Sequence, residues 1–155
     1  MSRRLHHTGR QGFTLIELVM VIVIMGILAV TVAVKWPHGL EERGAALELI
    51  RAVRYAQHKA LTRGYTTTND AWGLVAAGNT YTIRRLDGGD QAEADYINRA
   101  LPGKVVLGAG SVWFNGLGEP INSATGLPLA GPLPAATFTI GTSQVTVQPE
   151  TGYAE

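Results

Sequence analysis

A single carboxylate, Glu17, stands at the start of an apolar run that has no other charged residue up to Val34. A charge among apolar side chains in a membrane costs several kcal/mol unless an opposite charge pairs with it. Gly12 lies directly before this stretch, and Phe13 is its first apolar residue. The run therefore requires apolar surroundings along its length, and the carboxylate at its start indicates a function.

The residues on both sides of the run predict a helix that crosses a membrane. The first twelve residues contain no acid and three basic residues, Arg3, Arg4 and Arg10, which is typical of a cytoplasmic segment. As an α-helix, residues 13–36 would be about 36 Å long, enough for a hydrocarbon core of about 30 Å. Lys35 and Trp36 are suited to the far interface, where a snorkelling amine and an indole are stabilised. We expect the rest of the chain to lie outside the cytoplasm.

Three interpretations of this segment differ in where the chain is cleaved. A secretory signal would be cut after the apolar region, near Thr31-Val32-Ala33, but the run is long and Glu17 would have no purpose. An uncleaved anchor explains the length and leaves Glu17 equally unexplained. Cleavage after Gly12 would free the amine of Phe13 as a cation, four residues before the carboxylate. The third interpretation is the one that gives Glu17 a partner.

The junction resembles the prepilin leader motif of type IV pilins and type II secretion pseudopilins, with the sequence Gly12-Phe13-Thr14-Leu15-Ile16-Glu17-Leu18. The resemblance implies that a prepilin peptidase cuts after Gly12 and methylates Phe13. It also implies that Glu17 accepts the Phe13 amine of a neighbouring subunit, which sets the register of a filament. In a low-dielectric environment such opposite charges attract strongly, and either one alone is penalised.

That family implies a set of partners and a location. The partners would be the prepilin peptidase, other pilin or pseudopilin subunits, an inner-membrane assembly platform and membrane lipid. The chain would cross the bacterial inner membrane once, with its N-terminus in the cytoplasm and its C-terminal domain in the periplasm, before joining a pilus or pseudopilus. The expected parts are a cleaved leader over 1–12, a transmembrane helix over 13–36, a stalk helix over 37–63 and a globular domain over 64–155.

Beyond the apolar run, an amphipathic helix is expected. Pro37-His38-Gly39 predicts a bend or break, since proline removes a helix donor and glycine loosens the backbone. Helical spacing returns from Leu40 to Arg63, and Gly64 ends it. The apolar stripe consists of Ala46, Leu47, Leu49, Ile50, Val53, Ala56, Ala60 and Leu61. We expect this stripe to pack on a sheet. The basic residues beside it form either a basic patch for a partner or a solvated helix face, and the second is favoured: Arg51, Arg54, His58 and Lys59.

The remainder predicts short antiparallel strands. One hairpin joins Trp72–Val75 to Thr80–Arg84 through Gly78-Asn79, with Tyr81 and Ile83 on one face. The clearest hairpin joins Thr137–Ile140 to Gln144–Val147, where apolar and polar residues alternate. Further strands are expected over 105–107 and 112–114. A long helix followed by an antiparallel sheet is an α+β fold.

Two long connections interrupt the expected sheet. The first, Asp87 to Gly103, carries four carboxylates within nine residues, Asp87, Asp90, Glu93 and Asp95. Calcium is one hypothesis for them, but the defined twelve-residue loop ending in a bidentate Glu is absent, which favours a solvated acidic loop. The second, Asn115 to Ala136, is rich in Gly and Pro. It is expected to be an irregular surface segment, and it either carries a recognition site or acts as a spacer.

Parts of the globular region resemble the H-type minor pilin group, and most of all the minor pilins of mannose-sensitive haemagglutinin pili. The resemblance lies in Arg51–Gln57, Phe114–Pro120 and Glu150–Tyr153. It implies a helix followed by a β-rich domain that sits near a filament tip and helps to prime assembly.

Composition bounds the remaining function classes. Removal of twelve residues from 155 leaves 143, enough for one globular domain beside the helix, and takes the formal charge from +1 to −2. The last eight residues contain no Lys or Arg, so no nucleic-acid partner is expected. There is no Cys, and no arrangement of His, Ser or Gly indicates a metal, a cofactor or an enzyme. A structural filament subunit and a binding module displayed on a filament both stay open, as does the choice between a pilus and a secretion pseudopilus.

Overall fold

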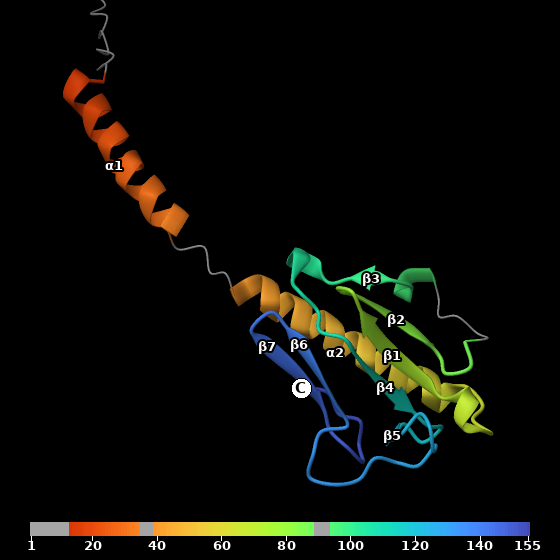
Figure 1. The fold of residues 1–155 in the computed structure, drawn as a ribbon. Helices are drawn as coiled ribbons and strands as arrows, with labels where there is room; N and C mark the ends of the chain where they lie inside the picture. The colour runs from red at the N-terminus through yellow and green to blue at the C-terminus, as the bar shows by residue number, and fades with distance from the viewer. Residues whose placement is uncertain (1–12, 35–38, 89–93) are drawn as a thin grey trace, which may run out of the picture. The chain divides into compact units, whose positions relative to one another are not determined.

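The computed structural model describes residues 13–34, 39–88 and 94–155, with the side chains of 30–34 and 94 excepted. The chain divides into two compact units, Met1–Pro37 and His38–Glu155. The first contains one described helix, α1 (Leu15–Val34), and the second contains the helix α2 (Gly39–Thr62) and all the strands (Figure 1). The helix-then-sheet order confirms the α+β class.

The helix α1 is apolar on every side. Leu, Ile, Val and Met fill most of its positions, and all its described side chains, from Leu15 to Ala29, are exposed. A helix that is hydrophobic all round is normally buried in a protein core or a membrane. Within the described part of the chain, no helix combines the length and the mean hydropathy needed to cross a bilayer.

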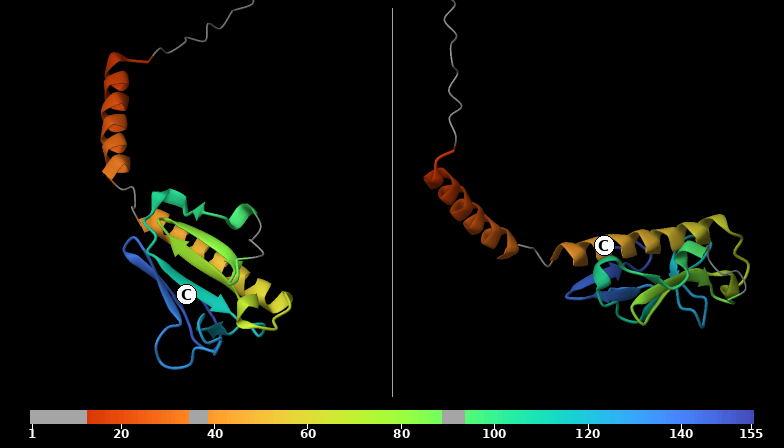
Figure 2. Two further views of the ribbon diagram at one scale, coloured as in Figure 1. Left: turned by 45° about the vertical axis from the view of Figure 1, so that its right-hand side comes forward. Right: turned by 90° about the horizontal axis from the view of Figure 1, so that it is seen from above.

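The helix α2 follows the expected amphipathic segment closely. It begins at Gly39, ends at Thr62 and carries Glu41 and Glu42 in its first turn, where the helix dipole favours negative charge. The expected break at Pro37-His38-Gly39 falls mostly outside the described residues, with Gly39 the first residue of the helix. In Figure 2 α2 lies along one side of the strands, and no other described segment of this unit covers its opposite side.

The larger sheet has five antiparallel strands in the order β3-β2-β1-β4-β5. Its bounds are β1 (Trp72–Ala77), β2 (Thr80–Arg85), β3 (Arg99–Ala100), β4 (Gly110–Phe114) and β5 (Pro120–Ile121). The β1–β2 turn places Gly78 and Asn79 at φ 57° and 66°, the left-handed region that a two-residue hairpin needs. The predicted hairpin is thereby confirmed, and Tyr81 and Ile83 are both buried.

The smaller sheet is the C-terminal hairpin of β6 (Ala136–Ile140) and β7 (Ser143–Val147), as predicted. An isolated bridge between Leu107 and Ile140 connects it to the segment that leads into β4. The C-terminus pairs with β7, where Thr146 and Glu155 exchange backbone hydrogen bonds of 2.8 and 3.0 Å. Three short 3₁₀ turns are described: η1 (Thr68–Asp70) lies between α2 and β1, η2 (Ala94–Tyr96) between β2 and β3, and η3 (Pro102–Lys104) between β3 and β4.

The core forms between α2 and both sheets. The buried face of α2 is built mainly from small residues: Ala45, Leu49, Ala52, Val53, Ala56 and Ala60. Against it lie the alternating inward residues of the strands, among them Leu74, Tyr81, Ile83, Val112, Phe114, Phe138, Ile140, Val145 and Val147. Alanine at four of the six helix positions lets the helix backbone approach the sheets closely, so the larger strand side chains fill the space between them.

Two details of the predicted packing are wrong. Leu47 and Leu61, placed in the apolar stripe, are 57% and 52% exposed, whereas Ala45 and Ala52 are buried. Residues 105–107 form no strand, and Leu107 alone makes a bridge. Backbone hydrogen bonds from Gly108 N–H to the Thr139 carbonyl and from Gly141 N–H to the Val106 carbonyl flank this bridge, while the Leu107 N–H donates to Asn79 Oδ1 at 3.1 Å.

Candidate functional site

The first turn of α1 holds Glu17 in a hydrogen-bonded cap. The Glu17 Oε2 atom accepts the backbone N–H of Thr14 at 3.0 Å and its hydroxyl at 3.0 Å. In the other direction the Glu17 N–H lies 3.4 Å from Thr14 Oγ1 and 3.1 Å from the Thr14 carbonyl. This reciprocal arrangement is a capping box, which satisfies the otherwise free N–H groups at a helix start.

The capping box gives Glu17 a local role that the sequence analysis missed. Its signal was present, because Thr14-Leu15-Ile16-Glu17 has the Ser/Thr-x-x-Glu spacing directly before an apolar run. The cap uses Oε2, and among the described residues no donor lies on Oε1. The carboxylate can therefore hold its own helix start and still accept a cation from another molecule.

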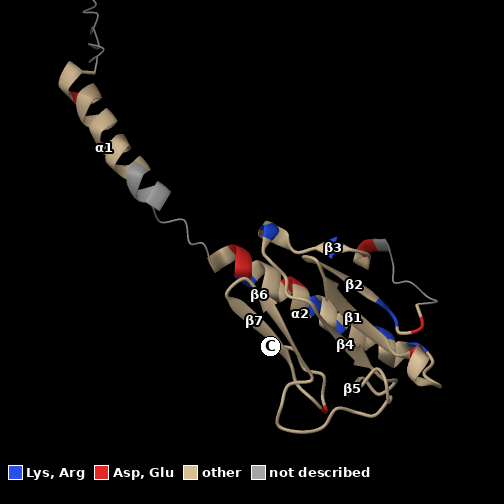
Figure 3. Ribbon diagram, viewed as in Figure 1, with Lys and Arg blue, Asp and Glu red and all other residues tan. Residues whose placement is uncertain are grey.

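The other residues predicted for processing and anchoring are only partly described. Phe13 lies beside the cap and is 86% exposed. Gly12, Lys35 and Trp36 fall outside the described residues. Figure 3 shows one acidic position near the start of α1, and the rest of the helix that the figure colours carries no charged residue. The described site is therefore an exposed aromatic residue followed, four positions on, by a capped carboxylate.

The acidic connection shows no calcium site in its described part. Asp87 accepts the Arg85 Nε–H at 3.1 Å, and Arg85 also lies 3.3 Å from Asp70, so these carboxylates are partnered by a guanidinium. Asp90 and Glu93 lie outside the described residues. Over the positions that the structure describes, no group of three or more His, Cys, Asp or Glu side chains could hold a metal ion.

Asp70 and Glu42 are carboxylates with perturbed titration in the second unit. Asp70 Oδ2 accepts the backbone N–H of Thr67 at 2.8 Å and of Thr66 at 3.0 Å, and these bonds, Thr67 first, lower its pKa. Glu42 accepts the Thr142 hydroxyl at 2.7 Å, which lowers its pKa too. Both carboxylates hold turns in place, at η1 and at the β6–β7 turn.

The segment 115–136 is irregular over most of its length, as predicted, but it contains the unpredicted short strand β5, and its start is tightly bonded. Asn115 is 8% exposed, and its Oδ1 accepts the N–H groups of Leu117 at 2.9 Å and Glu119 at 3.0 Å. Its Nδ2 donates to Glu119 Oε2 at 2.8 Å. Such Asx-type bonding fixes the turn, and Leu117 projects from it 76% exposed.

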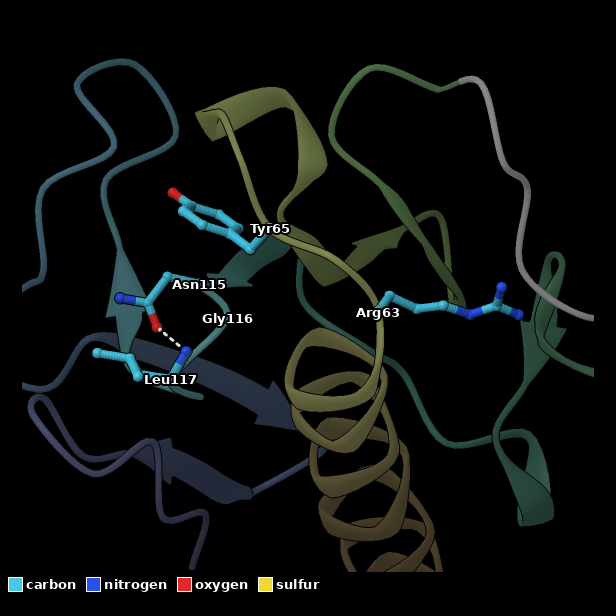
Figure 4. Close-up of a pocket in the computed structure, with 5 residues that line it drawn as sticks. All are labelled: Arg63, Tyr65, Asn115, Gly116 and Leu117. Atoms are coloured by element: carbon cyan, nitrogen blue, oxygen red, sulfur yellow. Dashed lines mark hydrogen bonds between the residues drawn. The ribbon is translucent and has the colours of Figure 1, made fainter.

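A pocket of about 350 Å³ lies at this turn, lined by Arg63, Tyr65, Asn115, Gly116 and Leu117. In Figure 4 the Arg63 side chain points away from Tyr65 and Asn115. The polar atoms of Asn115 are already bonded within their own loop. The pocket thus lacks the convergent polar groups that orient a small ligand.

A helix side chain fastens this loop and the C-terminal turn together. Gln57 Nε2 donates to the carbonyl of Gly118 and to the carbonyl of Thr151, each at 2.8 Å. Nearby, the Arg54 guanidinium lies 5.5 Å from the centre of the Tyr153 ring. Two segments that the sequence analysis treated separately, 115–120 and 149–153, therefore meet on one turn of α2.

Comparison with known proteins gives one match. Residues 8–33 match the family described as the prokaryotic N-terminal methylation motif. This stretch includes the predicted cleavage junction, the capping box and nearly all of α1. No curated protein and no solved structure matches the chain. The match supports a type IV pilin-like or pseudopilin-like chain that is processed by prepilin peptidase, anchored in a membrane and assembled with other pilins.

Proposed function

We propose that this protein is a minor subunit of a type IV pilus-like filament, made as a precursor and cut after Gly12. The new N-terminal residue, Phe13, is methylated, and residues 13–36 hold the subunit in the inner membrane until it enters the filament. Lys35 and Trp36 lie at the far interface. The observation that carries the proposal is α1, a helix that is apolar on all sides and begins with a capped carboxylate inside the matched motif.

The anchor follows from the solvation of α1. All its described side chains are exposed, and the apolar sequence continues to Val34 beyond the last described side chain. Burying a leucine- or isoleucine-sized side chain contributes roughly 1.5–3 kcal/mol. A membrane first, and then the helices of neighbouring subunits, would bury this surface.

The carboxylate sets the position of one subunit against the next. Glu17 Oε1 carries no hydrogen bond among the described residues, so the Phe13 amine of a neighbouring subunit can approach it without breaking the Thr14 cap. In apolar surroundings this pair is strongly favoured over two separated charges, because each charge alone would be desolvated without compensation. Contact between the two groups thereby fixes axial register.

Two substitutions of Glu17 separate its charge from its capping role. Glu17→Gln keeps an oxygen that can accept the Thr14 N–H, whereas Glu17→Ala removes both cap and charge. Both variants should be cleaved and inserted normally and should be depleted from purified filaments, as measured by immunoblot of filament and membrane fractions. Thr14→Val, which removes the hydroxyl and keeps the carboxylate, is the matched control and should be incorporated. Normal incorporation of Glu17→Gln would contradict the pairing.

The finer assignment, to the H-type minor pilin group and to mannose-sensitive haemagglutinin pili in particular, rests on sequence resemblance in the second unit. The structure adds that two of the resembling segments, 114–120 and 150–153, are bonded to the third through Gln57. A pilus and a secretion pseudopilus are distinguished by the companion genes and by whether deletion abolishes surface filaments or protein export.

A binding module displayed on the filament is a second candidate. Three leucines of the segment 115–136 are exposed by more than 60%: Leu117, Leu127 and Leu133. Long loops on a rigid scaffold often carry recognition. Replacing the three leucines by serine should abolish attachment of filament-bearing cells to a surface if this segment binds, with filament number unchanged. Unchanged attachment would contradict the binding role and leave the structural role as the remaining candidate.

A further inference from the structure

The side of α2 that faces away from the sheets carries a regular line of residues that the proposed function does not use. The exposed positions alternate at spacings of four and three, a pattern that stays on one side of a helix. We call this line the Leu–Arg face; it consists of Leu40, Gly44, Leu47, Arg51, Arg54, His58 and Leu61. Its length is about 32 Å, at roughly 1.5 Å per residue.

The cations of this face have no ion-pair partner among the described residues. Arg51 has neither an ion pair nor a ring contact there. Arg54 lies over the Tyr153 ring, which leaves its charge uncompensated. The guanidinium groups are therefore available to an anionic surface.

Two of the three carboxylates of α2, Glu42 and Glu48, are bonded to residues outside the helix, and the third, Glu41, lies against Gly103 of η3. Glu48 lies 2.8 Å from Arg99 and accepts the Tyr81 hydroxyl at 3.1 Å. Glu42 accepts the hydroxyls of Thr142 and Ser143. Positive charge is thus separated onto the Leu–Arg face, although the processed chain has a formal charge of −2.

We propose that, before assembly, the Leu–Arg face of α2 rests on the anionic lipid headgroups of the membrane that holds the anchor. This inference depends on the proposed function, because the anchor supplies the bilayer. Helices that present leucine together with arginine lie in the interface, with apolar side chains inserted and guanidinium groups at the headgroups. Leu40, Leu47 and Leu61, each exposed by more than half, are the inserted residues.

The covalent chain keeps this face close to a bilayer. The first residue of α2 follows the last residue of α1 by five positions, and a chain of that length spans at most roughly 17 Å. Tethering at such a distance gives a high effective concentration, so weak individual contacts are sufficient for docking. The docked subunit would leave the lipid when neighbouring subunits take the place of lipid around α2.

Site-specific labels test the docking in the full processed chain. The protein has no Cys, so one introduced cysteine carries a single environment-sensitive fluorophore. Three positions are required: Leu47→Cys on the Leu–Arg face, Ser111→Cys on the side of the larger sheet turned away from α2, and Met25→Cys in α1. Each variant is reconstituted in phosphatidylcholine vesicles with and without phosphatidylglycerol, and quenching by brominated lipid is measured.

The expected result is quenching at residue 25 in both vesicle types, quenching at residue 47 in the anionic vesicles alone, and none at residue 111. High salt should release residue 47, since screening shortens the reach of surface charge to about 3 Å at 1 M. A residue 47 label that stays unquenched in anionic vesicles, with residue 25 quenched, overturns the docking and leaves the anchor intact. An unquenched residue 25 overturns the anchor itself.

Charge reversal gives an independent arm with a matched control. Arg51→Glu changes two charge units on the face and should lower the ratio of docked to free subunits roughly thirty-fold, from about five-fold per unit near an anionic surface. Arg84→Glu makes the same change on the larger sheet, where Arg84 lies over the Trp113 ring outside the core that α2 shares with the sheets, and should leave the ratio unchanged. Equal effects of the two variants would overturn docking through this face. If instead the fluorescence of the residue 47 label depends on protein density in neutral vesicles, the face binds another protein copy, which also overturns lipid docking.

Discussion

Replacing Gln57 by alanine should loosen the distal end of the second unit. The Gln57 amide makes two hydrogen bonds of 2.8 Å, to the carbonyls of Gly118 and Thr151. Each bond contributes a net 0.5–1.5 kcal/mol in typical proteins, so the loss should be about 1–3 kcal/mol. Alanine is the better helix former, so any destabilisation comes from the lost bonds and not from helix propensity.

The assay is thermal unfolding of the fragment 38–155, which contains its own core. At roughly 4 °C per kcal/mol for a unit of this size, the midpoint should fall by about 4–12 °C. Amide exchange should rise most in 115–120 and 148–153, the two segments that Gln57 holds together, and least in β1. Gln144→Ala, at an exposed position of β7, is the control and should stay within about 0.5 kcal/mol of the parent.

The reasoning fails if Gln57→Ala unfolds within about 0.5 kcal/mol of the parent fragment. It also fails if exchange increases evenly through the fragment, because the bonds would then have no local role. Faster amide exchange in these two segments, without a change in β1, is the result expected of a side chain that holds the two segments together.

The remaining predictions concern a cap, the core and processing. The pKa of Asp70 is lowered, chiefly by the Thr67 N–H, so its contribution to stability is present above its unfolded pKa of about 3.9 and is lost as pH falls further. In urea melts of fragment 38–155, Asp70→Ala should therefore lack the part of the stability loss that the parent fragment shows on acidification. The same dependence of stability on pH in both fragments would refute this. Leu49→Ala should cost about 2–5 kcal/mol and Leu47→Ala less than about 0.5, because only Leu49 is buried; similar losses in denaturant melts would contradict the packing. Gly12→Ala should slow or block leader removal, and an unchanged mature N-terminus by mass spectrometry would count against it.

The sequence predicted the elements whose periodicity is strong. Alternation in Thr137–Ile140 and Gln144–Val147 and the Gly78-Asn79 turn specified both hairpins, because strand side chains alternate and this turn needs positive φ. The helix bounds of α2 were close for a similar reason, since Pro37 and Gly64 bracket it.

The sequence was less informative where small residues determine the packing or where tertiary hydrogen bonds determine the strand bounds. The predicted stripe on α2 included Leu47 and left out Ala45 and Ala52, but the sheets accept alanine, so Ala45 and Ala52 are buried and Leu47 is exposed. The apolar residues 105–107 looked like a strand, yet the Asn79 side chain takes the Leu107 N–H. Neither outcome follows from local pattern, because both depend on residues distant in the sequence.

The candidate site was located from the sequence, and its geometry was not. Glu17 was recognised as a carboxylate that needs a partner, but the capping box showed that Thr14 already holds one of its oxygens. The spacing of Thr14 and Glu17 carried that information. The Leu–Arg face likewise required the structure, because the sequence alone does not show which side of α2 the sheets cover.

The central claim is that the chain matures by cleavage after Gly12, so that a methylated Phe13 amine can meet Glu17 of the adjoining subunit. Intact-mass analysis of the protein purified from its native membrane tests this most directly. The account predicts a chain of residues 13–155 carrying one added methyl group. A chain that starts at Met1, or one that starts beyond residue 30, would contradict it.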